Sequence, residues 1–324
     1  MSSSFEVIGG QKLKGEIVPQ GAKNEALQII SAVLLTKEKV TISNIPDIRD
    51  VNLLIEILGD LGVKVARIND DTYSFQADEI NMEYLQGDVF RKKGAALRGS
   101  IMIIGPLLAR FKKAFMPKPG GDKIGRRRLD THFLALTELG ARVEIDGQFT
   151  FTANKLKGQD IFLDEASVTA TENAVMAAVL AEGQTILTNA ASEPHAQDLC
   201  AMLNSMGASI SGIGSNILTI EGVQNLSGTD FRIGSDYMEI GSFIGLAAVT
   251  HGSITITDVQ PRDLRPVRLA FGKLGIRWDI EGTTLTVPSQ QSLQVNSDLG
   301  GMIPKIDDAP WPGFPPDLTS IMTV

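Results

Sequence analysis

The chain has 324 residues, of which 43% are hydrophobic, and a formal net charge of −8 at pH 7. This size and composition indicate one large or two ordinary folded domains and exclude a disordered chain. The acidic balance argues against nucleic-acid binding, and neither a signal sequence nor an apolar stretch of membrane-spanning length is present. We therefore expect a cytoplasmic protein with no nucleic-acid, membrane or obligate protein partner.

A unit of strand, apolar helix, strand, polar helix and strand repeats along the chain. Its clearest marker is the end of the polar helix, a Leu-Gly or Met-Gly pair at Leu61-Gly62, Leu139-Gly140, Met206-Gly207 and Leu274-Gly275. These pairs follow one another at intervals of 78, 67 and 68 residues. A period this regular predicts four related structural repeats, with a fifth apolar helix beginning near the C-terminus.

The first helix of each repeat is apolar on nearly all sides, over residues 24–35, 100–109, 173–181 and 241–249. Helices of this kind belong inside a globule. The strands that follow alternate between apolar and polar residues, which is typical of sheets with one solvated face. The pattern therefore predicts an inverse α/β fold, with buried helices and sheets outside them.

Four segments carry residues suited to bind anions or move protons. At residues 21–25, Lys23 and Asn24 follow a glycine turn at a helix start, where free N–H groups can hold a phosphate, although such a lysine is usually only solvated. Arg98 precedes an apolar helix and needs a ligand or a carboxylate partner there. The last of the four segments carries Asp317, at the next helix start, which is a candidate catalytic residue or simply an N-cap.

The most basic segment, residues 110–128, holds eight lysines and arginines and one acid, Asp122. Its glycine-rich part, residues 119–128, suits an anionic small ligand because arginines bind phosphate oxygens and glycines allow close approach. The alternative is a solvated surface loop. Cys200, the only cysteine, is interpreted as a core residue, and with three scattered histidines it predicts no metal site and no cofactor.

Together these segments resemble the enolpyruvyl transferase family, in particular the transferases that act on UDP-N-acetylglucosamine. The matching stretches run along the whole chain in family order, at residues 21–27, 97–101, 105–111, 119–125, 129–132, 167–173, 191–194 and 311–317. The resemblance implies an inverse α/β, barrel-like fold of βαβαβ repeats with pseudo-threefold symmetry in two domains. It places residues 1–22 and 235–324 in a first domain and residues 23–234 in a second, which carries a mobile loop at 117–130. The active site is implied between the domains, and because only four repeats and a fragment are present, we expect a first domain that lacks its C-terminal repeats.

The resemblance also implies the reaction and its residues. The enolpyruvyl group of phosphoenolpyruvate passes to the 3′-hydroxyl of UDP-N-acetylglucosamine, phosphate is released, and peptidoglycan synthesis begins. The implied catalytic residues are Lys23, Asp122, Arg127 and Asp317, with Asp317 as base, Asp122 as the acid at C3, and phosphoenolpyruvate held by Lys23, Asn24 and Arg127. The implied nucleotide-sugar contacts are Arg98, Arg127, Arg128, Leu129, Asp130, Thr131, Ser167, Val168, Thr169 and Asp317.

Three positions depart from the family pattern. Asp122 stands where most members have a cysteine, so we expect insensitivity to fosfomycin, the epoxide that alkylates that thiol. Glu165 replaces a frequent lysine and Thr169 a glycine, which leaves both contacts open. Two alternatives remain: the sister transferase that acts on shikimate 3-phosphate, and a truncated, non-catalytic relative that binds a nucleotide sugar.

Overall fold

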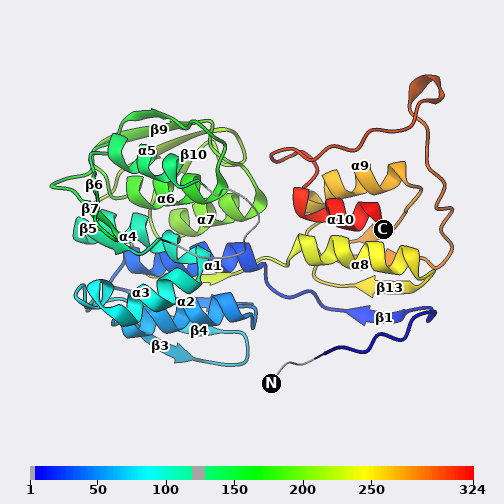
Figure 1. Ribbon diagram of the computed structural model, residues 1–324, viewed down its shortest axis with the longest axis horizontal. Coiled ribbons are helices and arrows are strands. Elements are labelled where there is room, and N and C mark those ends of the chain that lie inside the picture. Colours follow the sequence, from blue (N-terminus) through cyan, green and yellow to red (C-terminus); the bar gives the residue numbers. More distant parts are fainter. Residues whose placement is uncertain (1–3, 119–127) are drawn as a thin grey trace. The chain divides into compact units, whose positions relative to one another are not determined.

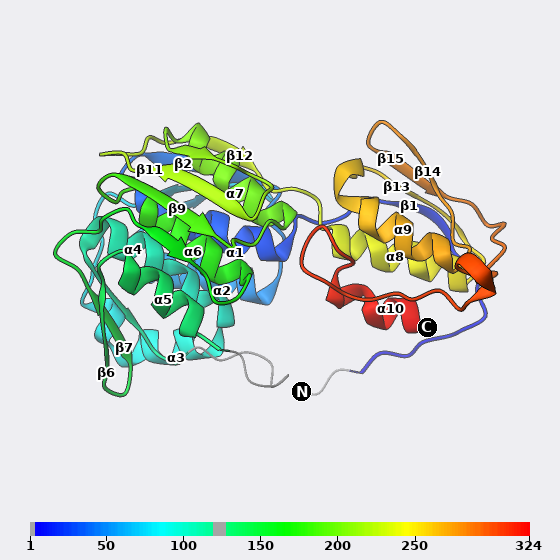
Figure 2. The ribbon, with the colours of Figure 1, turned by 90° about the horizontal axis from the view of Figure 1, so that it is seen from above.

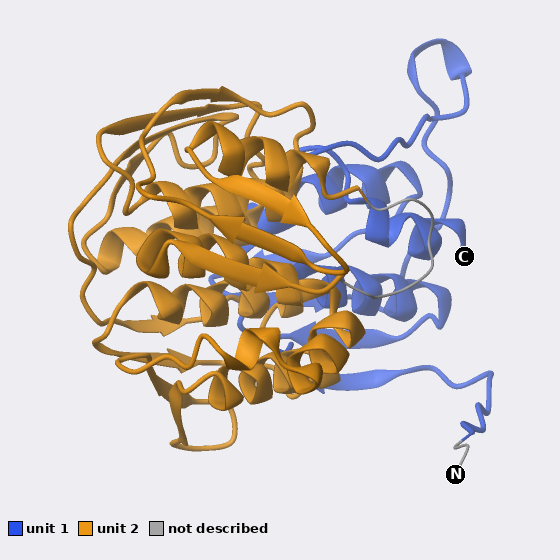
Figure 3. Cartoon of the chain, turned by 60° about the vertical axis from the view of Figure 1, so that its left-hand side comes forward, with its two compact units in different colours: residues 1–20, 235–324 blue, residues 21–234 orange. Residues whose placement is uncertain are grey.

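The computed structural model describes residues 4–118 and 128–324 (Figure 1). Its internal contacts divide the chain into two compact units, coloured separately in Figure 3. Unit 1 comprises Met1–Gln20 and Ser235–Val324, and unit 2 comprises Gly21–Gly234. The chain therefore passes from one unit to the other twice, and each unit is considered by itself.

Unit 2 has three sheets and a set of helices within them. The first sheet has the order β12-β2-β4-β3, the second β5-β7-β6 and the third β10-β11-β9-β8. The strands are β2 (Lys39–Ser43), β3 (Lys64–Arg67), β4 (Tyr73–Gln76), β5 (Lys113–Met116), β6 (Arg142–Ile145), β7 (Phe149–Thr152), β8 (Asp160–Phe162), β9 (Gln184–Thr188), β10 (Ser209–Ser211), β11 (Ile217–Glu221) and β12 (Asp230–Arg232). The helices are α1 (Lys23–Ala32), η1 (Val33–Leu35), α2 (Arg49–Asp60), η2 (Tyr84–Gln86), α3 (Asp88–Ala96), η3 (Arg98–Ile103), α4 (Ile104–Phe111), α5 (Asp130–Glu138), α6 (Val168–Ala178) and α7 (Pro194–Ser205).

Unit 1 has one four-stranded sheet of order β1-β13-β15-β14. Its elements are β1 (Lys14–Ile17), α8 (Tyr237–Val249), β13 (Ser253–Ile256), η4 (Pro261–Leu264), α9 (Arg265–Lys273), β14 (Asp279–Glu281), β15 (Thr284–Val287), η5 (Leu299–Gly301), η6 (Pro316–Leu318) and α10 (Thr319–Thr323). The unit has its own apolar core, in which α8 and α9 pack against the sheet around Phe271 and Trp278.

The four Leu-Gly and Met-Gly pairs end helices α2, α5, α7 and α9 in the same way. Each glycine has a positive φ, between 80° and 107°, a conformation that L side chains rarely adopt. In each case the next residue donates its N–H to a carbonyl five residues back, as Val63 does to Leu58 and Ala208 does to Leu203. This is the Schellman arrangement, and it confirms the predicted repeat at the level of backbone hydrogen bonds.

The prediction of a single strand after each polar helix is wrong. Each polar helix is followed by a two-stranded antiparallel hairpin, namely β3-β4, β6-β7, β10-β11 and β14-β15. The second strand of each hairpin then pairs with the strand that precedes the polar helix, as β4 pairs with β2. The barrel-like closure is also not found, because each sheet formed by the described residues is open and has three or four strands.

Strands at the two crossings between the units are exchanged between repeats. Strand β1, which opens the first repeat, pairs in parallel with β13 of the fourth repeat, in unit 1. Strand β12, which opens the fourth repeat, pairs in parallel with β2 of the first repeat, in unit 2. Each unit therefore contains a strand that belongs in sequence order to the other unit's repeat, which explains why unit 1 is discontinuous in the chain.

The apolar helices lie in the interior of unit 2, as predicted, with strands outside them (Figures 1 and 2). All side chains from Glu25 to Ala32 in α1, from Ile104 to Ala109 in α4 and from Ala170 to Ala178 in α6 are buried. The prediction is only partly right for α8 in unit 1, because Leu246 and Val249 are 41% and 48% exposed. The fourth apolar helix thus has one face uncovered within its own unit.

The three central helices of unit 2 run parallel. Near their N-terminal ends, Gln28 of α1 donates to Glu172 of α6 at 2.7 Å, and Asn173 of α6 donates to the carbonyl of Ile101 in η3 at 3.0 Å. Near their C-terminal ends, Arg110 of α4 donates to the carbonyl of Leu34, beyond α1. Parallel alignment gathers three positive helix-dipole ends at one end of unit 2 and three negative ends at the other.

Candidate active site

The first helix N-terminus of unit 2 presents Lys23 and Asn24. Ala22, the residue before α1, provides no side-chain cap, and no described residue accepts a hydrogen bond from the N–H of Lys23 or Asn24. Lys23 Nζ lies 2.7 Å from Asp50 Oδ2, and both side chains are 39% exposed. Asn24 is exposed. The helix end therefore offers unbonded N–H groups and a half-exposed cation, which together suit an anion.

The second helix N-terminus begins with Arg98, the first residue of η3. Its guanidinium is partly buried and donates from Nη2 to the carbonyl of Arg128 at 3.3 Å. One of its contacts is thus a main-chain carbonyl in the segment leading into α5. Arg98 is held toward the predicted nucleotide-sugar residues, 128–131, by this bond.

An aspartate that the sequence did not point to, Asp164, holds the start of α5. Its Oδ1 accepts from the hydroxyl of Thr131 at 2.7 Å, and its Oδ2 lies 3.2 Å from Arg128 Nη2. Arg128 also pairs with Asp130 at 3.1 Å. These contacts bring the predicted residues Arg128, Asp130 and Thr131 next to the segment that leads into α6, and Leu129 joins them as the half-buried residue before α5.

The third helix N-terminus carries Ser167, Val168 and Thr169. Ser167 caps α6 by accepting the N–H of Ala170 at 3.4 Å, so its hydroxyl already has a structural partner. Within the described part of the chain, the N–H groups of Val168 and Thr169 donate to no acceptor. Glu165 is exposed beside them. This end of α6 therefore has two main-chain donors free for a ligand.

His132 and Asn173 connect these helix starts and were not predicted as site residues. His132 is 2% exposed, its Nε2 lies 3.1 Å from Thr169 Oγ1, and its Nδ1 lies 3.1 Å from Asn173 Nδ2. Burial, with a smaller contribution from the charge of Arg98, lowers the pKa of His132 to about 3. The imidazole is therefore neutral at neutral pH. One sequence signal was available: His132 ends the 129–132 stretch, and a histidine facing a core needs a partner for each ring nitrogen.

Buried acids lie beneath the helix starts. Glu25 accepts the N–H of Gly234 at 3.0 and 3.1 Å, which fixes the end of unit 2 to α1. Glu172 is 1% exposed, and one of its carboxylate oxygens has no hydrogen-bond partner. Burial first, and then the charges of Glu193 and Glu25, raise the pKa of Glu172 well above its ordinary value. Glu172 therefore tends to hold its proton, which limits the negative charge beneath the anion site.

Two predicted residues lie outside the described part of the chain, and a third belongs to the other unit. Asp122 and Arg127 lie outside the described residues. Asp317 belongs to unit 1, where it is exposed in the first turn of η6. It makes no side-chain cap, since Pro315 and Leu318 are the capping residues of η6 and α10. The simple N-cap interpretation of Asp317 is therefore wrong.

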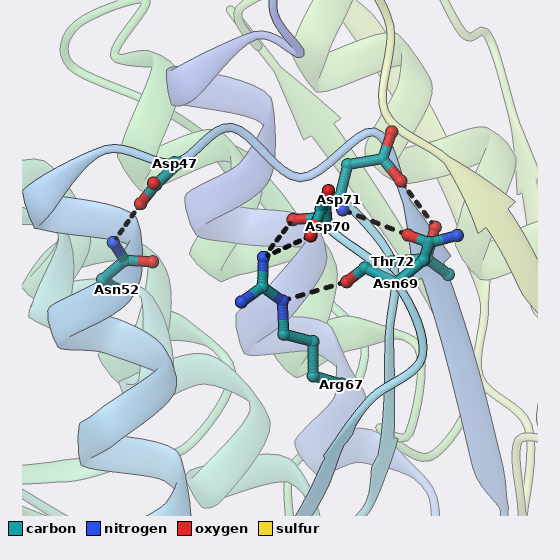
Figure 4. Close-up of polar contacts among 7 residues, drawn as sticks. All are labelled: Asp47, Asn52, Arg67, Asn69, Asp70, Asp71 and Thr72. Atoms are coloured by element: carbon teal, nitrogen blue, oxygen red, sulfur yellow. Dashed lines mark hydrogen bonds and ion pairs between the residues drawn. The ribbon is translucent and has the colours of Figure 1, made fainter.

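Another cation of unit 2, Arg67, is bonded within its own turn. Figure 4 shows Arg67 bonded to the β3-β4 turn, with its guanidinium donating to the carbonyl of Asn69 at 3.0 Å and to Asp70 at 3.1 Å. Asn52 bonds Asp47 in the same view, at 2.6 Å, near the start of α2. Arg67 therefore supplies no free cation for a ligand.

The described residues contain neither a single membrane-spanning helix nor a cluster of metal ligands. No single helix there has the length and composition of a membrane span, and one pair, Asp88–Ala96 with Arg98–Phe111, meets those criteria only together, across a 118° bend. Within the same residues, no group of three or more His, Cys, Asp or Glu side chains could hold a metal ion.

These features place Lys23, Arg98 and Arg128 at helix starts on an inverse α/β scaffold, and comparison with known proteins identifies its class. A sequence model of the family described as EPSP synthase (3-phosphoshikimate 1-carboxyvinyltransferase) matches residues 7–323. The chain belongs to this family, the enolpyruvyl transferases.

Within the family, relatives named UDP-N-acetylglucosamine 1-carboxyvinyltransferase are similar over nearly the whole chain. The Treponema denticola protein is 64% identical over 320 residues, covering 99% of this chain and 74% of its own length. The Bacteroides fragilis protein is 54% identical over 325 residues, covering 99% and 75%. The chain thus spans about three quarters of the length of these curated relatives.

Solved structures agree on the fold. The enolpyruvyl transferase NikO from Streptomyces tendae superimposes with a TM-score of 0.71 at 21% identity, over 86% of this chain and 66% of that chain. EPSP synthase from Acinetobacter baumannii gives 0.63 at 17% identity, over 87% and 66%. At these identities the likeness establishes the inverse α/β fold, as predicted, and nothing finer.

Proposed function

We propose that this chain is an enolpyruvyl transferase that moves the enolpyruvyl group of phosphoenolpyruvate to the 3′-hydroxyl of UDP-N-acetylglucosamine and releases phosphate. The observation that carries the proposal is the identity of 64% to a relative of that name over 99% of the chain. The gathering of three helix N-termini with Lys23, Arg98 and Arg128 supports it, since both substrates are anionic. In the cell this reaction serves peptidoglycan and hence cell-wall synthesis in the cytoplasm, and with it cell shape and division.

The proposed chemistry is addition followed by elimination. A base takes the proton of the sugar 3′-hydroxyl, the oxygen attacks C2 of phosphoenolpyruvate, and C3 receives a proton to give a tetrahedral intermediate. Loss of phosphate and of a proton from C3 then restores the double bond. We assign Asp317 as the base and Asp122 as the acid at C3.

We assign the neutralisation of the substrates' negative charge to the basic residues. We assign Lys23, Asn24 and Arg127 to phosphoenolpyruvate, with Lys23 exchanging its pairing with Asp50 for the anionic ligand. We assign Arg98, Arg127, residues 128–131, residues 167–169 and Asp317 to the nucleotide sugar. The N–H groups of Val168 and Thr169 are suited to its diphosphate because they lack acceptors at a helix N-terminus.

In domain terms, we propose that residues 1–22 with 235–324 and residues 23–234 act as the two domains of the transferase, with the segment 117–130 as the mobile loop of the second. We propose no cofactor and no protein partner for the reaction. The organic substrates carry all the groups transferred.

The acceptor substrate distinguishes the three candidate functions: transfer to UDP-N-acetylglucosamine, transfer to shikimate 3-phosphate, and nucleotide-sugar binding without catalysis. Binding of UDP-N-acetylglucosamine and of shikimate 3-phosphate is measured by calorimetry, and phosphate release from phosphoenolpyruvate is measured with each acceptor. Binding and release with the nucleotide sugar alone support the proposal. Release only with shikimate 3-phosphate contradicts it in favour of the sister enzyme, and nucleotide-sugar binding without release contradicts it in favour of a non-catalytic relative.

Asp122 makes the proposal testable by a covalent label. With nucleotide sugar present, we expect no fosfomycin adduct on the natural chain by mass spectrometry, because a carboxylate is a far weaker nucleophile than a thiolate. Cys200 does not substitute for it, because burial raises the pKa of its thiol to about 12. Asp122→Cys is expected to gain one adduct, and an adduct on the natural chain at residue 122 contradicts the assignment.

A further inference from the structure

A chain of hydrogen bonds with one fixed direction runs through the interior of unit 2 to its surface at Thr169. Gly105 N–H donates to Asn173 Oδ1 at 2.8 Å, which turns the amide nitrogen of Asn173 the other way. That nitrogen donates to the carbonyl of Ile101 at 3.0 Å and to His132 Nδ1 at 3.1 Å. Because a main-chain N–H can only donate and a carbonyl can only accept, the orientation of the amide is determined.

The amide in turn determines the tautomer of His132. Its Nδ1 accepts from Asn173, so the proton of the neutral ring resides on Nε2. That Nε2–H donates to Thr169 Oγ1 at 3.1 Å. Burial and the nearby charge of Arg98 disfavour a second proton on the ring, so the direction of the chain is the same throughout the neutral pH range.

Thr169 is where the chain of bonds reaches solvent. Its oxygen accepts from His132, which leaves its hydroxyl proton to donate outward, and no described residue accepts that proton. The side chain is exposed and stands in the first turn of α6, beside two main-chain N–H groups that also lack acceptors. Three donors therefore face outward at one helix end, and one of them has its polarity set from the core.

We propose that His132 is a positioning residue for nucleotide-sugar binding, which holds the Thr169 hydroxyl as a donor for a diphosphate oxygen. The inference rests on the proposed function and deepens it at the third helix N-terminus. It also gives the threonine at this position a role of its own: the hydroxyl adds a donor where a glycine has none. These donors favour a charged group such as a diphosphate over an uncharged sugar, because hydrogen bonds to an ionised acceptor are stronger than those to a neutral one.

The test compares variants of the full chain by calorimetry with UDP-N-acetylglucosamine and UDP. Thr169→Val keeps the shape and removes the hydroxyl, so we expect Kd for both ligands to rise roughly tenfold, the loss of about one hydrogen bond to a charged group. Thr169→Ser restores the hydroxyl and should recover most of the affinity. Thr185→Val is the matched control, because Thr185 Oγ1 is buried in β9 without a hydrogen-bond partner.

His132→Asn tests the origin of the effect. Asparagine still accepts from Asn173 but is too short to reach Thr169, so we expect a similar tenfold rise in Kd and no further rise when it is combined with Thr169→Val. In the natural chain, ¹⁵N spectra of the imidazole should show the Nε2–H tautomer from pH 6 to 8, whether or not His132→Asn folds. The Nδ1–H tautomer, or a Thr169→Val Kd equal to that of the natural chain, overturns the inference. Failure of the natural chain to bind either ligand instead overturns the proposed function, and with it the premise of the inference.

Discussion

The two ends of the central helices of unit 2 differ in what balances their dipoles. At the C-terminal end, Arg110 donates to the carbonyls of Leu34 and Thr36 at 3.0 and 2.9 Å, and Lys112 donates to the carbonyl of Ala109. At the N-terminal end, the N–H groups of α1 and α6 identified above have no acceptor in the described chain. One end is thus closed by the protein's own cations, and the other is left for an anion.

The comparison shows why a pocket at the closed end is not a second anion site. That pocket has a volume of about 510 Å³ and includes Lys37, Arg110 and Lys112 in its lining. Each helix C-terminus contributes about half a negative charge, and these cations offset it. Burial lowers the pKa of both Arg110 and Lys112 because it disfavours the charged form, and both side chains already donate to main-chain carbonyls.

The largest effect is expected at the open end. Lys23→Met removes the cation but keeps the apolar stem, and kcat/KM with phosphoenolpyruvate should fall roughly 100-fold through the loss of a charged contact. Steady-state phosphate release measures it. Arg67→Met is the control, because Arg67 is bonded within its own turn. An equal loss of kcat/KM in both variants would show that the loss comes from the change in net charge and not from the position of Lys23 at the open end.

At the closed end the expected effect is on stability. Arg110→Met leaves two buried carbonyls without a donor, which should lower the free energy of unfolding by about 2–3 kcal/mol. Urea unfolding measures the change, and calorimetry should give an unchanged Kd for UDP-N-acetylglucosamine. Weakened ligand binding at unchanged stability would contradict the division between the two ends.

Two buried histidines of unit 2, His132 and His195, predict a pH dependence. The pKa of His132 is lowered to about 3, and burial lowers that of His195 to about 4. Below about pH 6.5 these histidines bind protons in the unfolded chain but not in the folded chain. The free energy of unfolding therefore decreases as the pH is lowered, by about 1.4 kcal/mol per pH unit for each histidine.

This loss extends from about pH 6.5 down to the folded values. Glu172 opposes it above its own ordinary pKa, because its raised pKa lets the folded chain take up that proton before the unfolded chain does. Thermal melts between pH 5 and 8 measure the slope. In the His132→Asn variant, only one of the two histidines remains to take up a proton on unfolding, so stability should change less steeply with pH. An unchanged pH dependence would show that His132 is not the group responsible.

The smallest effect is expected away from both ends, in β9. Thr185→Val replaces a buried hydroxyl without a hydrogen-bond partner by a methyl group, so stability should stay within about 1 kcal/mol or rise. Urea unfolding and ligand calorimetry measure both quantities. A large loss of stability would mean that the hydroxyl has a role that the fold does not show.

Part of this molecule could be predicted from sequence because the signals are local. A Leu-Gly pair at a helix end predicts the Schellman turn, since only glycine adopts the positive φ cheaply, and this held at Gly62, Gly140, Gly207 and Gly275. The burial of α1, α4 and α6 followed from apolar residues on every face.

Other features depend on contacts between distant segments, and the periodicity of the sequence does not predict such contacts. The pairing of β1 with β13 and of β12 with β2 joins residues more than 180 positions apart. Lys23, Arg98 and Thr131 were predicted as site residues from resemblance, whereas Asp164, His132 and Asn173, which position some of them, were not. Their roles come from hydrogen bonds between α5, α6 and η3, and no short motif records those bonds.

The most direct test of the open end is amide NMR of the ¹⁵N-labelled chain titrated with UDP-N-acetylglucosamine. The account predicts the largest shifts at the N–H groups of Lys23, Val168 and Thr169, and none at Thr36 and Lys112 beside the closed end. Shifts concentrated at the closed end, or an equal response of both ends, would contradict it.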